Sequence, residues 1–170
     1  MKKFLLAVAL LAGVSVSSFA QSKSDDGGKF SIGVEAGLPV GDISDGYNFA
    51  IGGSLKYAQP IADATAFTIS AGYTSFMGKT VSVAGFSAKA PALGFVPVKV
   101  GIKYNFAEAF YGEAQVGATF GTKSGTGTFF AYSPGIGYNF GGGVDLGVRY
   151  EGWAHDGTIS QVAARLAYSF

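Results

Sequence analysis

Apolar and polar residues alternate one by one through most of the chain, and the pattern is cleanest at its end. One set of alternate positions there is apolar: Val162, Ala164, Leu166, Tyr168 and Phe170. The other set includes Gln161, Arg165 and Ser169. Because successive side chains of a β-strand point to opposite faces, this period of two predicts a strand with one apolar face. We therefore expect residues 161–170 to form a strand that ends on an aromatic residue.

The same alternation predicts eight strands. Their expected ranges are 29–38, 47–57, 64–76, 93–106, 110–120, 129–140, 144–153 and 161–170. In each range alternate positions are apolar, and the positions between them are polar or glycine. Val98 and Val100, for example, flank Lys99. A tilted transmembrane strand needs roughly 9 to 11 residues, and the ranges supply this length with room left for connections.

Composition narrows the class of β-protein. The 170 residues include 27 Gly, 15 Phe and 9 Tyr, and the mean hydropathy is +0.31. Apolar content spread over short alternating segments is typical of a transmembrane β-barrel. The sequence of a soluble barrel or sandwich also alternates between apolar and polar residues, but its polar face would be exposed to solvent. Here the polar face is instead dense in glycine and in charges of both signs. We therefore predict an all-β fold, namely an eight-stranded antiparallel up-and-down transmembrane β-barrel.

The first twenty residues have a different pattern. Lys2 and Lys3 precede an apolar run over 4–16, and Ser18 and Ala20 place small residues where a signal peptidase cleaves. The run is shorter than the roughly 20 residues of a membrane-spanning helix. The predicted organisation is a cleaved signal peptide at 1–20, a short N-terminal extension at 21–28, and an outer-membrane barrel domain at 29–170.

The net charge argues against one class of partner, and the lack of cysteine excludes covalent links through sulfur. The chain has 12 Lys and Arg against 11 Asp and Glu, and cleavage after Ala20 would leave 10 against 11. A near-neutral chain without a basic cluster argues against nucleic acid as a partner. Because the sequence contains no cysteine, it has neither a disulfide framework nor a thiol for lipid attachment.

A repeated Tyr-x-Phe motif predicts the topology. It occurs at 104–106, 138–140 and 168–170, which close alternate strands and should therefore form one aromatic girdle at the periplasmic rim. Short turns at that rim are expected at 58–63, 107–109 and 141–143. Outer loops are expected at 39–46, 77–92, 121–128 and 154–157.

Charged residues gather on the polar faces, which the barrel would turn inward. The predicted barrel-interior charges are Glu35, Lys56, Lys99, Lys103, Glu113, Asp145, Arg149, Glu151 and Arg165. Because an eight-stranded interior is only wide enough for side chains, each charge needs a partner to offset its desolvation. The hairpin geometry places Lys103 opposite Glu113 as one such ion pair. This interpretation favours a structural polar core over an ion path.

Together, the export signal, the eight alternating strands, the glycine-rich inner face and the terminal Ala-Tyr-Ser-Phe resemble the small outer-membrane β-barrel proteins of the OmpA/OmpX-like and opacity-porin-like group. The resemblance covers the whole mature chain and implies the outer membrane of a Gram-negative cell. It also implies that Tyr168 and Phe170 form the assembly signal, and that the barrel-assembly machinery and periplasmic chaperones are partners. The peptidoglycan-binding domain of some relatives is expected to be absent.

Candidate catalytic residues are few. His155 is the sole histidine and stands beside Asp156, but the nearby Thr158 and Ser160 belong to no nucleophile motif. Lipid A deacylases and palmitoyl transferases are small barrels as well, yet their active-site pattern is not matched here. We therefore expect no enzyme activity, no cofactor and no metal.

The outer loops are the better candidates for binding. Residues 80–87 alternate around Ala84-Gly85, which predicts a hairpin that protrudes beyond the membrane. Lys79, Lys89 and Lys123 are outer-loop cations that suit lipopolysaccharide phosphates. The expected function is a structural or cell-surface interaction role, with a surface protein or host ligand bound by the outer loops. The alternatives are a narrow porin-like channel for small solutes and a lipid A-modifying enzyme.

Overall fold

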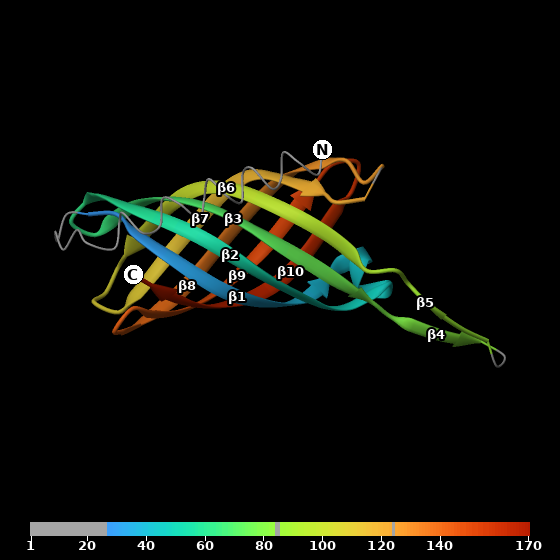
Figure 1. Ribbon diagram of the computed structural model, residues 1–170. Coiled ribbons are helices and arrows are strands. Elements are labelled where there is room, and N and C mark those ends of the chain that lie inside the picture. Colours follow the sequence, from blue (N-terminus) through green and yellow to red (C-terminus); the bar gives the residue numbers. More distant parts are fainter. Residues whose placement is uncertain (1–26, 84–85, 124) are drawn as a thin grey trace, which may run out of the picture.

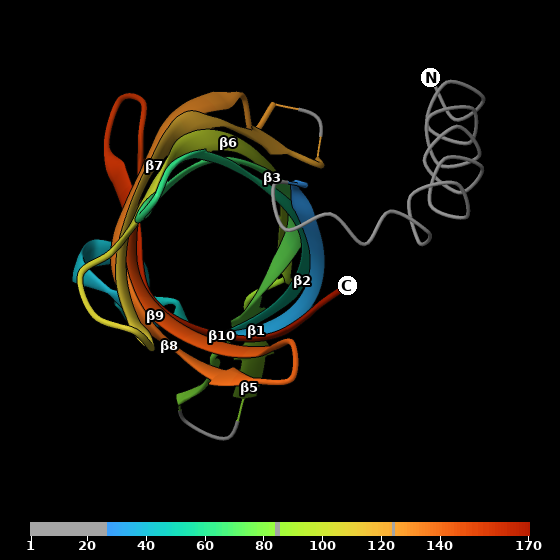
Figure 2. The same cartoon turned by 90° about the vertical axis from the view of Figure 1, so that its left-hand side faces the viewer.

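A computed structural model describes residues 27–83, 86–123 and 125–170 of the chain. Within these residues eight strands form a closed antiparallel barrel (Figures 1 and 2). They are β1 (Lys29–Val40), β2 (Tyr47–Ala62), β3 (Thr65–Gly78), β6 (Leu93–Asn105), β7 (Phe110–Gly121), β8 (Thr128–Gly141), β9 (Val144–Ala154) and β10 (Thr158–Ser169). Each strand pairs with its neighbours along the barrel, and β1 pairs with β10 to close it. The predicted eight-stranded up-and-down barrel is confirmed.

Two strand boundaries differ appreciably from the sequence prediction. β2 continues five residues further, to Ala62, so the turn predicted at 58–63 is mostly strand. Pro60 is accommodated because the β2–β3 register shifts between Pro60 and Ala62, and an irregular strand end tolerates a residue without an N–H group. β10 begins at Thr158, because pairing with β9 and β1 holds its first residues in the sheet.

The exposure of the side chains is the reverse of that in a soluble protein. Large apolar residues on the outward positions stay exposed, with Val34 at 65% and Ile136 at 66%. Charged residues on the inward positions are buried, with Glu151 at 1% and Arg165 at 4%. An apolar outside and a polar inside are the arrangement of a transmembrane barrel. No helix in the described part of the chain is long and apolar enough to cross a bilayer.

The two rims of the barrel differ in their connections. Short turns at 63–64, 106–109 and 142–143 share one rim with both ends of the barrel sequence. The other rim has longer connections at 41–46, 79–92 and 122–127 and a short one at 155–157. Transmembrane barrels place short turns in the periplasm and longer loops outside. One of the outer loops contains η1 (Gly41–Asp45), a single turn of 3-10 helix.

The predicted aromatic girdle surrounds the short-turn rim. Phe110 lies between two other rings, with centroids 6.4 Å from Phe106 and 4.7 Å from Tyr138. Phe30 and Tyr57 lie 4.6 Å apart at the same rim. The girdle extends to the end of the chain, where Tyr168 and Phe170 are 53% and 55% exposed. Aromatic rings at this level suit the boundary between lipid and water.

A second, two-stranded sheet projects from the outer rim. β4 (Thr80–Val83) and β5 (Phe86–Lys89) pair with each other beyond the barrel (Figure 1). The predicted protruding hairpin is confirmed for these two strands, while its expected turn at Ala84-Gly85 lies outside the described residues. The predicted signal peptide at 1–20 and most of the 21–28 extension also lie outside them, so cleavage stays a prediction.

Candidate functional site

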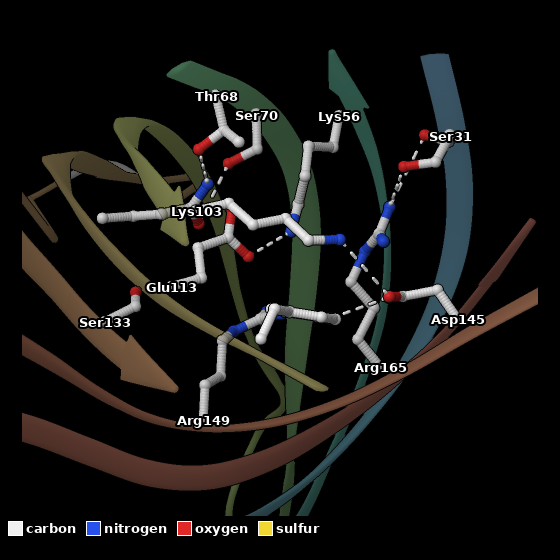
Figure 3. A network of polar contacts seen from close by, with 12 residues as sticks. Ser31, Lys56, Thr68, Ser70, Lys103, Glu113, Ser133, Asp145, Arg149 and Arg165 are labelled. Carbon is white, nitrogen blue, oxygen red and sulfur yellow. Dashed lines mark hydrogen bonds and ion pairs between the residues drawn. The ribbon is translucent and has the colours of Figure 1, made fainter. Parts of the chain in front are cut away.

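The lumen holds the densest set of functional groups among the described residues. All nine predicted interior charges lie there, on alternate positions of β1, β2, β6, β7, β9 and β10. They form three neighbouring groups of ion pairs and hydrogen bonds, which we call the charge network and part of which is seen in Figure 3. Because these side chains reach toward the axis from six strands, the network ties distant parts of the barrel together.

One end of the network centres on Glu151. Its carboxylate pairs with the Lys99 ammonium and lies 3.1 Å from the Arg149 Nε atom. Lys99 also donates to the Ser133 hydroxyl at 2.9 Å, and the Gln161 amide donates to Glu151 Oε2 at 2.7 Å. These contacts supply hydrogen-bond partners to a carboxylate that is fully buried, as a buried charge requires.

Glu35 joins two arginines in the middle of the lumen. Arg149 Nη2 donates to Glu35 Oε2 at 2.6 Å, and Arg165 Nε lies 3.6 Å from Glu35 Oε1. Ser54 completes the group, since its hydroxyl donates to Glu35 at 2.5 Å and accepts from Arg165 at 2.8 Å. Gly33 leaves room for the Arg165 guanidinium, because a Cβ there would lie 2.8 Å from it.

The predicted ion pair between Lys103 and Glu113 is wrong, although the register that suggested it is correct. The two residues are cross-strand partners on β6 and β7. Glu113 instead pairs with Lys56 of β2, and Lys103 Nζ lies 3.7 Å from Asp145 of β9. In this narrow lumen a long side chain reaches across the axis as easily as along the sheet. Charge partners therefore include residues of strands that are not neighbours, although Glu35 and Arg165 are register partners on β1 and β10.

Tyr111 lies at the end of the network nearest the short-turn rim. Its hydroxyl donates to Asp145 Oδ1 at 2.9 Å, and the Lys103 ammonium lies 3.6 Å from its ring centroid. A cation over an aromatic face is stabilised by the ring quadrupole. Gly137 provides the space for this ring, because a Cβ there would lie 2.2 Å from the Tyr111 side chain.

Little empty space is left around these groups. Two cavities of about 20 and 10 Å³ lie along the network, and each has room for about one water molecule. No three His, Cys, Asp or Glu side chains of the described ranges stand close enough to hold a metal ion. In the described structure the interior is therefore occupied by paired side chains.

An aromatic cluster above the network was not predicted. Phe76, Phe95 and Trp153 meet inside the barrel near the outer rim, packed with Ala50 and Ala131, and we call these five residues the aromatic cap. Each lies on the inward face of its strand, which the strand parity could have revealed. Sequence analysis missed the cap because these aromatic residues stand near strand ends, on a face expected to be polar.

The outer-loop cations lie in different settings. The Lys79 ammonium donates to the Ser44 carbonyl at 2.6 Å, so it is engaged within the protein. Lys123 is exposed on the loop between β7 and β8, and the Lys89 backbone pairs with Thr80 in the two-stranded sheet. His155 Nε2 lies 3.5 Å from Asp156 Oδ2, but the Asp156 side chain is 97% exposed, which leaves the pair in water.

Comparison with known proteins gives a likeness of structure alone. No protein-family model and no curated protein sequence match the chain. The Yersinia pestis outer membrane protein Ail in a phospholipid nanodisc is 18% identical, with a TM-score of 0.59 over 85% of this chain and 100% of that chain. The N-terminal β-barrel domain of Pseudomonas aeruginosa OprF is 10% identical, with a TM-score of 0.54 over 84% of this chain and 97% of that domain.

The chain has the fold of the small OmpA/OmpX-like outer-membrane barrels. A de novo designed transmembrane β-barrel is also similar, at 13% identity and a TM-score of 0.52, over 84% of this chain and 95% of the design. A shared fold does not by itself indicate an activity. Function must therefore be argued from the surface and the lumen.

Proposed function

We propose that this chain is a non-enzymatic outer-membrane barrel that presents its β4–β5 sheet outside the cell to bind another protein by strand addition. The observation that carries this proposal is the isolation of that sheet. Among the described residues its two strands pair only with each other. Each strand therefore has an open edge, whose unpaired N–H and C=O groups can pair with an extended segment of a partner.

The sheet is small. In its backbone register Val81 pairs with Ala88, and Val83 pairs with Phe86. An isolated two-stranded sheet is marginally stable in water. A third strand from a partner would therefore stabilise it.

The base of the sheet is firmly held by the barrel. The Lys79 amide donates to the Gly46 carbonyl at 2.8 Å, and the Ala90 amide donates to the Lys79 carbonyl at 3.1 Å. Tyr47 adds a hydrogen bond from its hydroxyl to the Pro91 carbonyl at 3.2 Å. A held base lowers the entropic cost of binding, because the edges are already positioned away from the membrane.

The packed lumen supports a surface role over transport, since the two cavities described along the charge network have room for about one water molecule each. A structural neighbour, the attachment invasion locus protein Ail, has been solved with the heparin analogue sucrose octasulfate. By analogy of fold, we propose that lipopolysaccharide phosphates lie near Lys123 and Lys89 of this chain. Outer-membrane lipid, periplasmic chaperones and the barrel-assembly machinery complete the proposed partners.

The test uses the purified protein in nanodiscs and a displayed library of extended peptides. Residues 80–89 are replaced by Asn-Gly in one variant, and Ser82→Pro blocks a strand edge in a second, with Lys123→Ala as the control outside the sheet. We expect selected peptides to bind the parent and Lys123→Ala alike, to slow hydrogen exchange in β4 and β5, and to lose affinity for both sheet variants.

Peptide binding that survives removal of the sheet would contradict the proposal. Steady conductance of the parent in planar bilayers would favour the channel alternative instead. A change in lipid A mass in cells that express the chain would favour the enzyme.

A further inference from the structure

We infer that the lumen is a cup with one open end: the aromatic cap closes it toward the outside, and water enters the charge network from the periplasmic rim. This inference concerns the interior and is independent of the proposed binding sheet. It rests on two observations, namely the packing of the cap and the gradient of exposure along the lumen.

The cap is a tightly packed cluster inside the barrel near its outer rim. Its residues come from the outer halves of five strands, β2, β3, β6, β8 and β9, and each is at most 1% exposed. The three rings contact one another, with centroids 4.9 to 5.8 Å apart. Tyr47, Leu93, Phe129 and Ile159 pack against the cluster.

The charged side chains beside the cap are less exposed than those near the short-turn rim. Glu151 lies two positions from Trp153 along β9, and Lys99 lies four positions from Phe95 along β6. These two side chains are 0% and 4% exposed. Lys103 and Asp145, toward the short-turn rim, are 20% and 10% exposed. Because water contact increases toward that rim, the network is hydrated from the periplasm.

The chemistry of the two ends explains the asymmetry. An apolar constriction repels ions and water, since nothing in it replaces their hydration. The charged residues toward the periplasmic rim offer hydrogen-bond partners to both ions and water. Small hydrophilic solutes and ions of the periplasm can therefore reach Lys103 and Asp145, whereas the same species outside the cell cannot reach Lys99 or Glu151.

Single-cysteine variants test this sidedness cleanly, because the natural sequence has no cysteine. The purified protein is inserted into lipid vesicles and treated from one side with a charged, membrane-impermeant methanethiosulfonate reagent. Lys123→Cys marks the outer-loop side. We expect Lys103→Cys to react from the opposite side alone, and Ser133→Cys, beneath the cap, to be protected from the outer-loop side.

Variants that open the aromatic cap provide a second test of the inference. Trp153→Ala in the Ser133→Cys background should remove the protection from the outer-loop side. Phe130→Ala is the matched control, because this aromatic residue of β8 points outward and should leave the protection intact. If Trp153→Ala fails to fold, Phe95→Leu replaces it, and the sidedness of Lys103→Cys tests the inference without any cap variant.

Equal reaction of Lys103→Cys from both sides would overturn the inference. So would fast reaction of Ser133→Cys from the outer-loop side while the cap is intact. Neither result depends on whether the β4–β5 sheet binds a protein, so failure here is distinguishable from failure of the proposed function.

Discussion

Glu35 differs from the other interior acids at the scale of single residues, because its two arginine partners reach it from strands β9 and β10. Asp145 has a looser environment, with Lys103 at 3.7 Å and with partial exposure. Both acids lie in the lumen, yet the cost of losing each should differ. A buried charge without its partner is unstable, whereas water can compensate a partly hydrated one.

Removing the carboxylate charge tests this difference. Glu35→Gln leaves Arg165 without an ion-pair partner among the described residues and Arg149 with Glu151 alone, and it should lower the free energy of unfolding by about 3–5 kcal/mol, as for other broken buried pairs. Asp145→Asn should cost less, because Asp145 has a single cation at 3.7 Å and the amide oxygen can still accept from the Tyr111 hydroxyl. Urea unfolding in lipid vesicles measures both, and equal losses would contradict the assigned partners.

The corrected partner of Glu113 gives a second test. In a double-mutant cycle, Lys56→Met and Glu113→Gln should show a coupling of about 0.5–3 kcal/mol, because each single change orphans the other charge. The cycle of Lys103→Met with Glu113→Gln should show a smaller coupling, since these residues share a register position without an ion pair. A larger coupling for Lys103 would restore the partner that the register suggested.

The alternation of apolar and polar residues predicted the strands, because a one-residue shift of register would turn every apolar side chain of a strand into the lumen. Parity alone therefore placed Glu35 and Lys99 on the inner face. Contacts across the lumen, such as those of Lys99 with Glu151 and of Lys56 with Glu113, could not be predicted in the same way, since they depend on strand tilt and barrel closure, which alternation does not encode. Gly101 shows the same limit: alternation places it on the inner face, but only the structure shows that a Cβ there would lie 2.2 Å from the Ala114 carbonyl oxygen.

The last element, β10, closes the barrel against β1. The Phe170 amide donates to the Phe30 carbonyl at 2.9 Å, so the final residue contributes a backbone hydrogen bond as well as a ring of the girdle. Deleting Phe170 should reduce the yield of folded outer-membrane protein, measured by heat-modifiable migration. Phe170→Ala keeps the amide, and an intermediate yield would separate the two contributions. An unchanged yield in the deletion would contradict a role of this residue in assembly.

The whole molecule depends on a lipid-facing belt between the two rims. Val100 lies in mid-strand and is 41% exposed, and Tyr104 lies on the same face near the girdle. Val100→Arg should lower the free energy of unfolding in vesicles by about 2–4 kcal/mol, whereas an arginine at Tyr104 should cost about 0–1 kcal/mol from charge burial. Equal refolding of Val100→Arg and the parent would reverse the assignment of the faces.

The pairing of β1 with β10 has a kinetic consequence. Ser31 and Ser169 are partners at opposite ends of the described barrel, so the closing contacts have the longest loop to organise and form slowly. Until the final strand arrives, both terminal strands expose a hydrogen-bonding edge, and such edges promote aggregation. Export of the last residues therefore limits when folding can finish, and a nascent chain stalled before residue 158 would remain an open sheet that needs continuous protection.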